Sequence, residues 1–337
     1  MQAAVIYAPS DIRIESRAEP APGPGEVLIR VRACGVCGTD HSLFTGGFPA
    51  TYPVVIGHEF AGEVAATGPG VTGFKLGDRV TADPNNVCRC CDYCQLGALH
   101  LCENLRSMGV HRDGADAEYV IAPESNTYHI PDSLSYEQAA FTEPLACVVH
   151  GVQLAQVQPG DTVVILGAGG IGNLLAQVAA HAGAAAVIVS EPIAARRQRA
   201  LENGATHAID PTRQDAVAEV KRIRRIGADV VFEAAGNLGL QASAVRMARK
   251  GGTVVWFGCS PQDGTIQVNP FYVNDSELKI VGSFNNPFAT GRALALLSSG
   301  AVRVDNLVSH RFGLADYLDV FRVWGGPDTL KLMVCVD

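Results

Sequence analysis

Two patterns of apolar and polar positions divide this chain. Up to about residue 147, short segments alternate apolar and polar side chains, with Gly and Pro between them, as in 26–33, 62–68 and 78–83. A period of two residues is typical of strands with one buried face and one solvated face. The first part is therefore expected to consist mostly of β-strands and turns.

From about residue 148, apolar strand segments alternate with helical segments. The strands are expected at 162–167, 186–191, 207–210, 229–234 and 253–258, and the helices between them at 170–183, 192–204, 214–225 and 238–249. This alternation predicts an α/β fold with a doubly wound parallel sheet. A last helix at about 287–300 and a tail of strands complete the chain.

One apolar segment is long enough to suggest a membrane span. Residues 163–180 carry no charge over 18 positions, which is about the length of a short membrane span. Their clustered glycines divide them into a strand and a helix, and no second segment of this kind occurs. The N-terminus also lacks a basic segment followed by an apolar one. We therefore expect a cytoplasmic protein without a membrane partner.

Length and charge narrow the possibilities further. The 337 residues, 47% of them hydrophobic, are enough for two domains. The net charge of −8 and the lack of a polybasic run argue against nucleic acid or an anionic membrane as a partner.

The segment G167-A-G-G-I-G172 fits the dinucleotide motif G-x-G-x-x-G and lies between an expected strand and helix. Gly167 would form the tight turn, Gly169 would let the backbone approach a pyrophosphate, and Gly172 would let helix and strand pack closely. Gly170 and Ile171 would open the helix, whose free N–H groups favour an anion. A glycine-rich turn without a ligand is the alternative.

An acidic residue follows at the end of the next expected strand. Glu191 lies 19 residues after Gly172, where a carboxylate can accept from both ribose hydroxyls and repel a 2′-phosphate. This favours NAD(H) over NADP(H). Arg196 and Arg197 follow closely and could weaken that preference.

Five cysteines occur within residues 88–102. In a reducing compartment such a cluster more often binds a metal than forms disulfides. Four of them follow the spacing C-x2-C-x2-C-x7-C, which suits a closed, structural zinc site: Cys88, Cys91, Cys94 and Cys102. Cys90 is then the spare thiol. A nucleic-acid-binding zinc ribbon is disfavoured by the acidic chain.

A second set of metal ligands is dispersed along the chain. Cys37, His58, Glu59 and Glu143 offer a thiolate, an imidazole and two carboxylates. One ligand of each kind leaves a zinc position open for water or substrate, as catalytic sites require. Taken singly, a Cys in an apolar strand is usually core, and a Glu before Pro often begins a helix. Spacing alone does not join residues more than 100 positions apart.

Together these segments resemble the zinc-containing medium-chain dehydrogenase/reductase family, close to its sorbitol (polyol) dehydrogenase branch. Residues 57–80 match the family pattern G-H-E-x2-G-x5-G-x8-G-D-R-V. The GVCGTD segment at 35–40, the four-cysteine segment, E143-P-L and GAGGIG follow in the family's order. The resemblance covers essentially the whole chain.

The resemblance implies a GroES-like catalytic domain over 1–147 and 289–337, around an inserted Rossmann NAD-binding domain over 148–288. It implies a catalytic zinc on Cys37, His58 and either Glu59 or Glu143. In the polyol branch the residue that matches Glu59 typically binds the zinc, and the residue that matches Glu143 often holds the metal's water. Thr39 occupies the position of the hydroxyl that starts the family's proton relay. The resemblance also implies a homodimer or a homotetramer.

The chain departs from the family pattern at several positions. Ser42 stands where the family often has a relay His, and His41 precedes it. Asn285 and Asn286 stand where sorbitol dehydrogenases have an Arg-Tyr pair. The small amide side chains still suit the recognition of hydroxyl groups, but the replacement puts sorbitol itself in doubt as the substrate. Cys34 is an extra thiol, expected to be a small buried residue. Phe44 is a candidate for the apolar wall of the substrate site, with core packing as the alternative.

We therefore expect an enzyme that reversibly transfers hydride from a secondary hydroxyl of a polyol to NAD⁺, giving a ketose. The alternatives are a zinc dehydrogenase for another alcohol, a diol, a sugar or L-threonine, and a catalytically silent NAD-binding protein. A zinc-free quinone reductase of the same fold would lack both sets of ligands.

Overall fold

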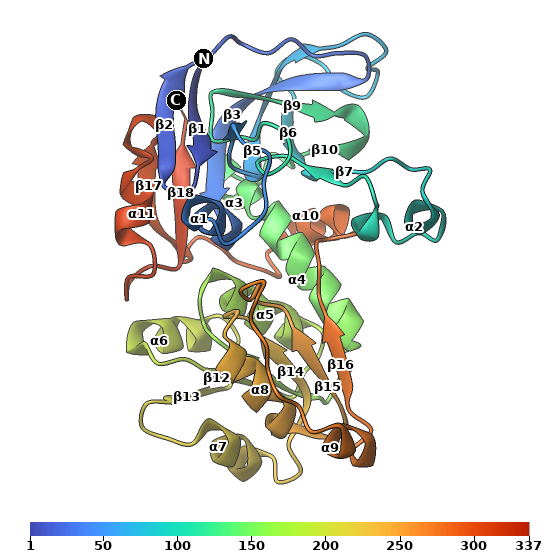
Figure 1. The fold of residues 1–337 in the computed structure, drawn as a ribbon, viewed down its shortest axis with the longest axis vertical. Helices are drawn as coiled ribbons and strands as arrows, with labels where there is room; N and C mark the ends of the chain where they lie inside the picture. Colours follow the sequence, from blue (N-terminus) through green and yellow to red (C-terminus); the bar gives the residue numbers. More distant parts are fainter. Residues whose placement is uncertain (337) are drawn as a thin grey trace. The chain divides into compact units, whose positions relative to one another are not determined.

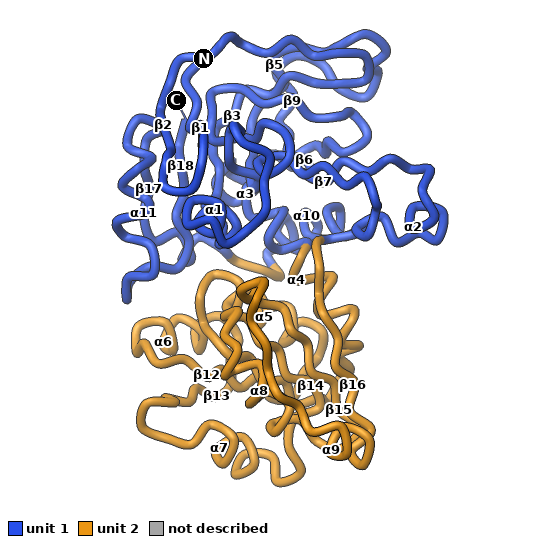
Figure 2. The backbone as a smooth tube through the Cα atoms, viewed as in Figure 1, with its two compact units in different colours: residues 1–146, 286–300, 304–337 blue, residues 147–285, 301–303 orange. Residues whose placement is uncertain are grey.

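The chain divides into two compact units. The computed structural model describes residues 1–336. Unit 1 comprises residues 1–146, 286–300 and 304–337, and unit 2 comprises residues 147–285 and 301–303. Figure 2 shows the two units in different colours. The boundaries expected from the sequence, at 148 and 288, lie within one and three residues of the ends of the longer segment of unit 2.

Unit 1 is mainly β-structure. Its strands are β1 (Gln2–Ala8), β2 (Asp11–Ser16), β3 (Glu26–Val36), β4 (Val54–Val55), β5 (Glu59–Thr67), β6 (Arg79–Ala82), β7 (Asn85–Asn86), β8 (Arg106–Ser107), β9 (Tyr119–Pro123), β10 (Thr127–His129), β17 (Val308–Gly313) and β18 (Lys331–Cys335). Its helices are α1 (Gly38–Thr45), α2 (Asp92–Gln95), α3 (Tyr136–Ala140), α10 (Thr290–Ser298) and α11 (Asp319–Val323), and α4 (Thr142–Ala155) continues into unit 2. Short 3₁₀ turns lie at Leu99–Leu101, Glu124–Asn126 and Leu314–Asp316.

Strand β3 organises this unit. The main sheet has the order β10-β6-β5-β3-β18-β17, and β9 also pairs with β3. Strand β3 pairs with β5 in antiparallel fashion, with Gly35 opposite Glu59, and its other edge pairs with β18, with Gly35 opposite Met333. The tail of the chain thus completes a sheet begun by its first third, as Figure 1 shows for β3 and β18.

Unit 2 has the expected alternation of strands and helices. Its elements are β11 (Thr162–Leu166), α5 (Gly170–His181), β12 (Ala186–Ser190), α6 (Ala194–Glu202), β13 (His207–Ile209), α7 (Ala216–Ile223), β14 (Ala228–Glu233), α8 (Leu238–Met247), β15 (Ala248–Trp256), α9 (Pro270–Asp275) and β16 (Lys279–Gly282). The six strands form one parallel sheet in the order β13-β12-β11-β14-β15-β16. This is the strand order of the doubly wound dinucleotide fold, so the predicted fold class is confirmed.

The uncharged segment 163–180 is not a membrane span. Its first residues belong to β11, which is fully buried, and the rest forms the glycine-rich turn and most of α5. Over residues 1–336, the structure has no helix of the length and apolar character needed to cross a bilayer.

Candidate active site and metal centres

Three of the four dispersed ligands come together in unit 1. One ligand atom from each of Cys37, His58 and Glu59 lies within 4.8 Å of the other two. The pairing of β3 with β5 explains this, because Cys37 directly follows β3 and Glu59 is the first residue of β5. Glu143, in the first turn of α4, is only 9% exposed but is not among the residues that this grouping includes.

A fourth residue, Asp40, supports this cluster and was missed by the sequence analysis. Its Oδ2 accepts a hydrogen bond from the backbone N–H of Cys37 at 2.8 Å, and its Oδ1 lies 3.5 Å from Nδ1 of His58. Asp40 is fully buried. Burial opposes a charge on His58, but Asp40 and then Cys37 outweigh it and raise the pKa of His58 well above its usual value. A carboxylate three residues after the cysteine was the available signal, since metal-bound His is usually oriented by a carboxylate.

The residues present fit a catalytic zinc ion. The candidate ligands include two groups that can carry a negative charge, and His58 and Glu59 are only 8% and 1% exposed. Buried polar and charged groups are costly unless a cation or a donor satisfies them. Sulfur, nitrogen and oxygen donors in this combination are those that Zn²⁺ takes, and three protein ligands leave one position open.

A buried lysine also contacts the cluster. Lys331, the first residue of β18, is 8% exposed, and its Nζ forms an ion pair with Oε2 of Glu59. The sequence analysis missed Lys331, which lies 272 positions after Glu59. A lone lysine at the start of an apolar strand was the one local signal.

Some of the residues expected in the proton relay and the substrate site make packing contacts with other side chains. Thr39 is half-buried in the first turn of α1. His41 stacks on Trp324 with ring centroids 5.1 Å apart, and burial lowers the pKa of His41. Phe44 stacks on Phe321 at 4.2 Å and packs against the core of unit 1, as its alternative interpretation supposed. The contacts of Ser42 that the structure gives are made by its backbone carbonyl.

The two asparagines fall in different units. Asn286 belongs to unit 1, is 1% exposed, and accepts a hydrogen bond from Nδ2 of Asn85 at 2.9 Å through its Oδ1. Asn285 belongs to unit 2 and has a φ of 55°. Asn286 therefore has a structural contact with β7, which leads into the cysteine-rich segment. A substrate role for either residue stays a prediction.

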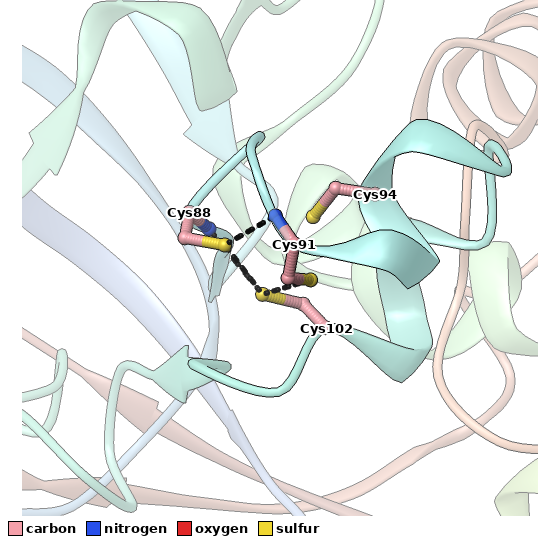
Figure 3. A group of neighbouring side chains, drawn as sticks. All are labelled: Cys88, Cys91, Cys94 and Cys102. Carbon is pink, nitrogen blue, oxygen red and sulfur yellow. Dashed lines mark hydrogen bonds between the residues drawn. The ribbon is translucent and has the colours of Figure 1, made fainter.

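The four-cysteine site is assembled as its spacing predicts. The sulfur atoms of Cys88, Cys91, Cys94 and Cys102 all lie within 4.8 Å of one another. Figure 3 shows the four side chains pointing toward a common centre. Cys90 is exposed and lies outside this group, and Cys34 is a fully buried residue of the unit 1 core.

The electrostatics of this lobe suit a divalent cation. The backbone N–H groups of Cys90 and Cys91 stabilise the thiolate of Cys88 and lower its pKa to about 5. Burial, followed by the neighbouring thiols, raises the pKa of Cys94 to about 12. Four thiolates this close repel one another unless a metal ion neutralises them, and metal binding releases their protons. The cluster thus fits a structural Zn²⁺.

The glycine-rich turn has the geometry expected of a pyrophosphate site. Gly167 has a φ of 102°, which favours glycine, and Gly169 caps the N-terminus of α5. A Cβ on Gly169 would meet nothing within 4 Å, so the space in front of the helix is open. A Cβ on Gly172 would instead collide with the backbone carbonyl of Gly167. The turn fits the diphosphate of a nicotinamide coenzyme.

Glu191 lies beside this turn, directly after β12. The residue is 4% exposed, and each oxygen of its carboxylate accepts a hydrogen bond from a backbone N–H. Oε2 accepts from Ala168 at 2.8 Å and Oε1 from Ile193 at 3.0 Å. The carboxylate therefore also ties the turn to the end of β12, a role that the sequence analysis did not anticipate.

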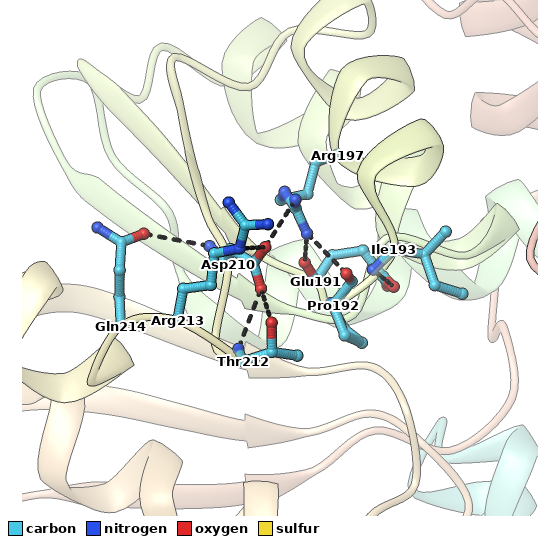
Figure 4. Close-up of polar contacts among 8 residues, drawn as sticks. All are labelled: Glu191, Pro192, Ile193, Arg197, Asp210, Thr212, Arg213 and Gln214. Atoms are coloured by element: carbon cyan, nitrogen blue, oxygen red, sulfur yellow. Dashed lines mark hydrogen bonds and ion pairs between the residues drawn. The ribbon is translucent and has the colours of Figure 1, made fainter.

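The arginines after β12 are only partly available to a phosphate. Arg197 forms an ion pair with Asp210 at 2.9 Å and donates to the carbonyls of Glu191 and Pro192. Figure 4 shows this network, with Asp210 also accepting from Thr212. Arg196 is half-buried in the first turn of α6. The charge of Arg197 is thus already balanced within the protein.

Each of the two units contains a segment that matches a known protein family. Residues 23–132 match the alcohol dehydrogenase GroES-like domain, and residues 170–299 match the zinc-binding dehydrogenase domain. The sorbitol dehydrogenase of Bacillus subtilis (strain 168) is 36% identical over 342 residues, covering 99% of this chain and 97% of the relative. The chain belongs to the zinc-binding dehydrogenase family. The expected combination of a GroES-like and a Rossmann-type domain is confirmed.

Other relatives of this chain have different named substrates, and one has been solved with NADP. The L-threonine 3-dehydrogenase of Pyrococcus horikoshii is 37% identical, with 93% of this chain and 92% of the relative covered. A crystal structure of a zinc-binding dehydrogenase from Sinorhizobium meliloti 1021 bound to NADP matches with a TM-score of 0.97 and 41% identity, over 99% of this chain and 98% of that one. Family membership therefore establishes a zinc-dependent dehydrogenase that uses a nicotinamide coenzyme.

Proposed function

We propose that this dehydrogenase oxidises a secondary hydroxyl of a polyol to a ketone, reversibly, giving a ketose. The observation that carries the proposal is the grouping of Cys37, His58 and Glu59 within 4.8 Å of one another. A site with these three ligands can bind a metal and still admit a hydroxyl group. The similarity to a sorbitol dehydrogenase over 99% of the chain supports the polyol class.

Cys37, His58 and Glu59 would hold the catalytic zinc, and Glu143 would hold its water. When bound, the zinc acts as a Lewis acid toward the substrate hydroxyl, and the nicotinamide coenzyme accepts the hydride. Asp40 fixes the ring of His58 through Nδ1. Glu143 would act as the local base and Thr39 as the first hydroxyl of the proton relay. His41, whose pKa is lowered by burial, would be neutral at pH 7 and able to accept a proton.

The same proposal includes a preference for NAD(H) over NADP(H). It rests on Glu191, a carboxylate at the end of β12 beside the glycine-rich turn, where a 2′-phosphate would be repelled. The pairing of Arg197 with Asp210 supports it, because that arginine is not free to balance the added charge. The NADP-bound relative makes this preference the point that most needs a test.

The coenzyme preference is tested with Glu191→Gln. The amide keeps one acceptor for the backbone N–H groups and removes the negative charge. We expect kcat/KM for NADP⁺ relative to NAD⁺ to rise by about tenfold or more, because one unit of repulsion at an effective dielectric of about 20 is worth a few kcal/mol at close range. Arg199→Gln, on α6 but paired with Glu202, is the matched control. An unchanged ratio in Glu191→Gln would remove Glu191 from coenzyme selection.

A second candidate substrate is L-threonine, favoured by the 37% identity to an L-threonine 3-dehydrogenase. The two candidates share the metal site and the coenzyme and differ in the groups around the reacting hydroxyl. A panel of C4 to C6 polyols, L-threonine, ethanol and butanediol, with coenzyme reduction followed by absorbance and zinc quantified on the same sample, separates them. Turnover of a polyol and two zinc ions per chain supports the proposal, whereas turnover of L-threonine alone refutes the polyol assignment.

We further propose that the protein works in the cytoplasm as a homodimer or a homotetramer. A reducing compartment keeps the four thiols of the lobe available for a metal. Light scattering of the purified chain measures the assembly state.

A further inference from the structure

Lys331 is a buried cation placed at the catalytic cluster. The residue is 8% exposed, and its partner Glu59 is 1% exposed. A buried ammonium group is unfavourable unless a carboxylate compensates it. The ion pair with Oε2 of Glu59 provides this compensation.

The sheet is built to allow this pair. Strand β3 lies between β5, which carries Glu59, and β18, which carries Lys331. Gly35 of β3 is the residue opposite Glu59, and a Cβ there would lie 2.7 Å from Cε of Lys331 and would also collide with Oε2 of Glu59. The absence of a side chain at Gly35 is therefore what lets Lys331 reach across the central strand.

We propose that Lys331 is a positioning residue that makes Glu59 a one-oxygen ligand of the catalytic metal. Because the ammonium group holds Oε2, the carboxylate offers its other oxygen to the metal. A carboxylate free to bind through both oxygens would fill the position that a hydroxyl substrate needs. The inference rests on the proposed zinc-dependent function and assigns to Lys331 the task of keeping that position open.

The test compares Lys331→Met, Lys331→Gln and Lys331→Arg. Lys331→Met removes the charge and the donor, Lys331→Gln keeps a donor without charge, and Lys331→Arg keeps both. Lys279→Met is the matched control, because Lys279 also begins a strand (β16) but is exposed. Thermal unfolding of each variant shows whether it folds, and if Lys331→Met does not fold, Lys331→Gln carries the comparison.

The decisive readout is the visible spectrum of the cobalt-substituted protein without substrate. The four-cysteine site contributes the same background in all variants, so difference spectra report the catalytic site. We expect Lys331→Met to show the weaker bands of a higher coordination number, with kcat and metal retention against a chelator each reduced by about 10- to 100-fold. Lys331→Arg should restore most of the spectrum and of kcat, and Lys279→Met should match the unmodified chain.

The outcomes separate this inference from the proposed function. If folded Lys331→Met has the cobalt spectrum and metal retention of the unmodified chain, the positioning role is overturned, whatever the activity. If the unmodified chain turns over no polyol but the cobalt spectrum still depends on Lys331, the substrate assignment fails and the positioning role stands.

Discussion

Two glycines of the same turn should respond to alanine in opposite ways. Gly169 has φ −67° and ψ −168°, a conformation that alanine adopts without strain, and its Cβ would meet nothing within 4 Å. Gly→Ala at such a position stabilises a protein by about 0.4–1 kcal/mol through the unfolded state. We therefore expect Gly169→Ala to fold with an unchanged or slightly higher melting temperature.

The loss should appear in coenzyme binding. The methyl group would occupy the open space before α5, where a pyrophosphate would approach the backbone N–H groups. Losing one or two hydrogen bonds to a charged group costs about 1.5–3 kcal/mol each. A loss of about 3 kcal/mol corresponds to a dissociation constant for NADH weaker by on the order of 100-fold.

The assay is a fluorescence titration with NADH in the absence of substrate, together with thermal unfolding without coenzyme. Gly172→Ala is the contrasting variant, because its Cβ would collide with the carbonyl of Gly167 and lie 2.9 Å from that residue's carbonyl carbon. Overpacking of this kind costs about 1–3 kcal/mol, so Gly172→Ala should melt at a lower temperature. The reasoning is refuted if Gly169→Ala binds NADH as tightly as the unmodified chain, or if it loses stability as Gly172→Ala does.

Two further predictions concern the cysteine lobe and a buried carboxyl group. Cys94→Ser should lower the zinc content from about two ions per chain to about one, because it removes one of four ligands of the closed site; metal analysis after dialysis measures this, and two retained ions would contradict the assignment. Asp116 is fully buried, and its burial, followed by the charge of Asp40, raises its pKa to about 7. Because this carboxyl group holds its proton more tightly when folded than when unfolded, its ionisation weakens the fold progressively from about pH 4 to about pH 7. Asp116→Asn removes that penalty. Its free energy of unfolding minus that of the unmodified chain should therefore be larger at pH 8 than at pH 5. Equal differences at the two pH values in urea unfolding would rule this out.

The parts of the fold that depend on short-range patterns were predictable. The apolar runs of β11, β12 and β14 and the helices between them gave the parallel sheet, because each element carries its own period and its own bounding glycines. Prediction was less complete in the first third, where short strands such as β4 (Val54–Val55) have too few residues for a period to appear. Strand β15 begins at Ala248, within the segment expected to be helical, because its start pairs with Ala228 across the sheet.

In the candidate site, too, some features follow from local sequence patterns and others depend on the tertiary structure. The grouping of the four cysteines followed from the sequence, since they lie within 15 residues and their spacing brings them together. Glu191 was placed correctly at the end of its strand, but the direction of its carboxylate toward Ala168 and Ile193 depends on where the turn lies after folding.

The sequence by itself thus determined the class of fold, the glycine-rich turn and the grouping of the four cysteines, because local spacing and periodicity specify these. Only the tertiary structure decided that Glu59 rather than Glu143 groups with Cys37 and His58. It alone also brought Lys331 to Glu59 across Gly35. The physical reason is that β5, β3 and β18 become neighbours through the strand order of the whole sheet, which joins segments far apart in the chain and leaves no local pattern.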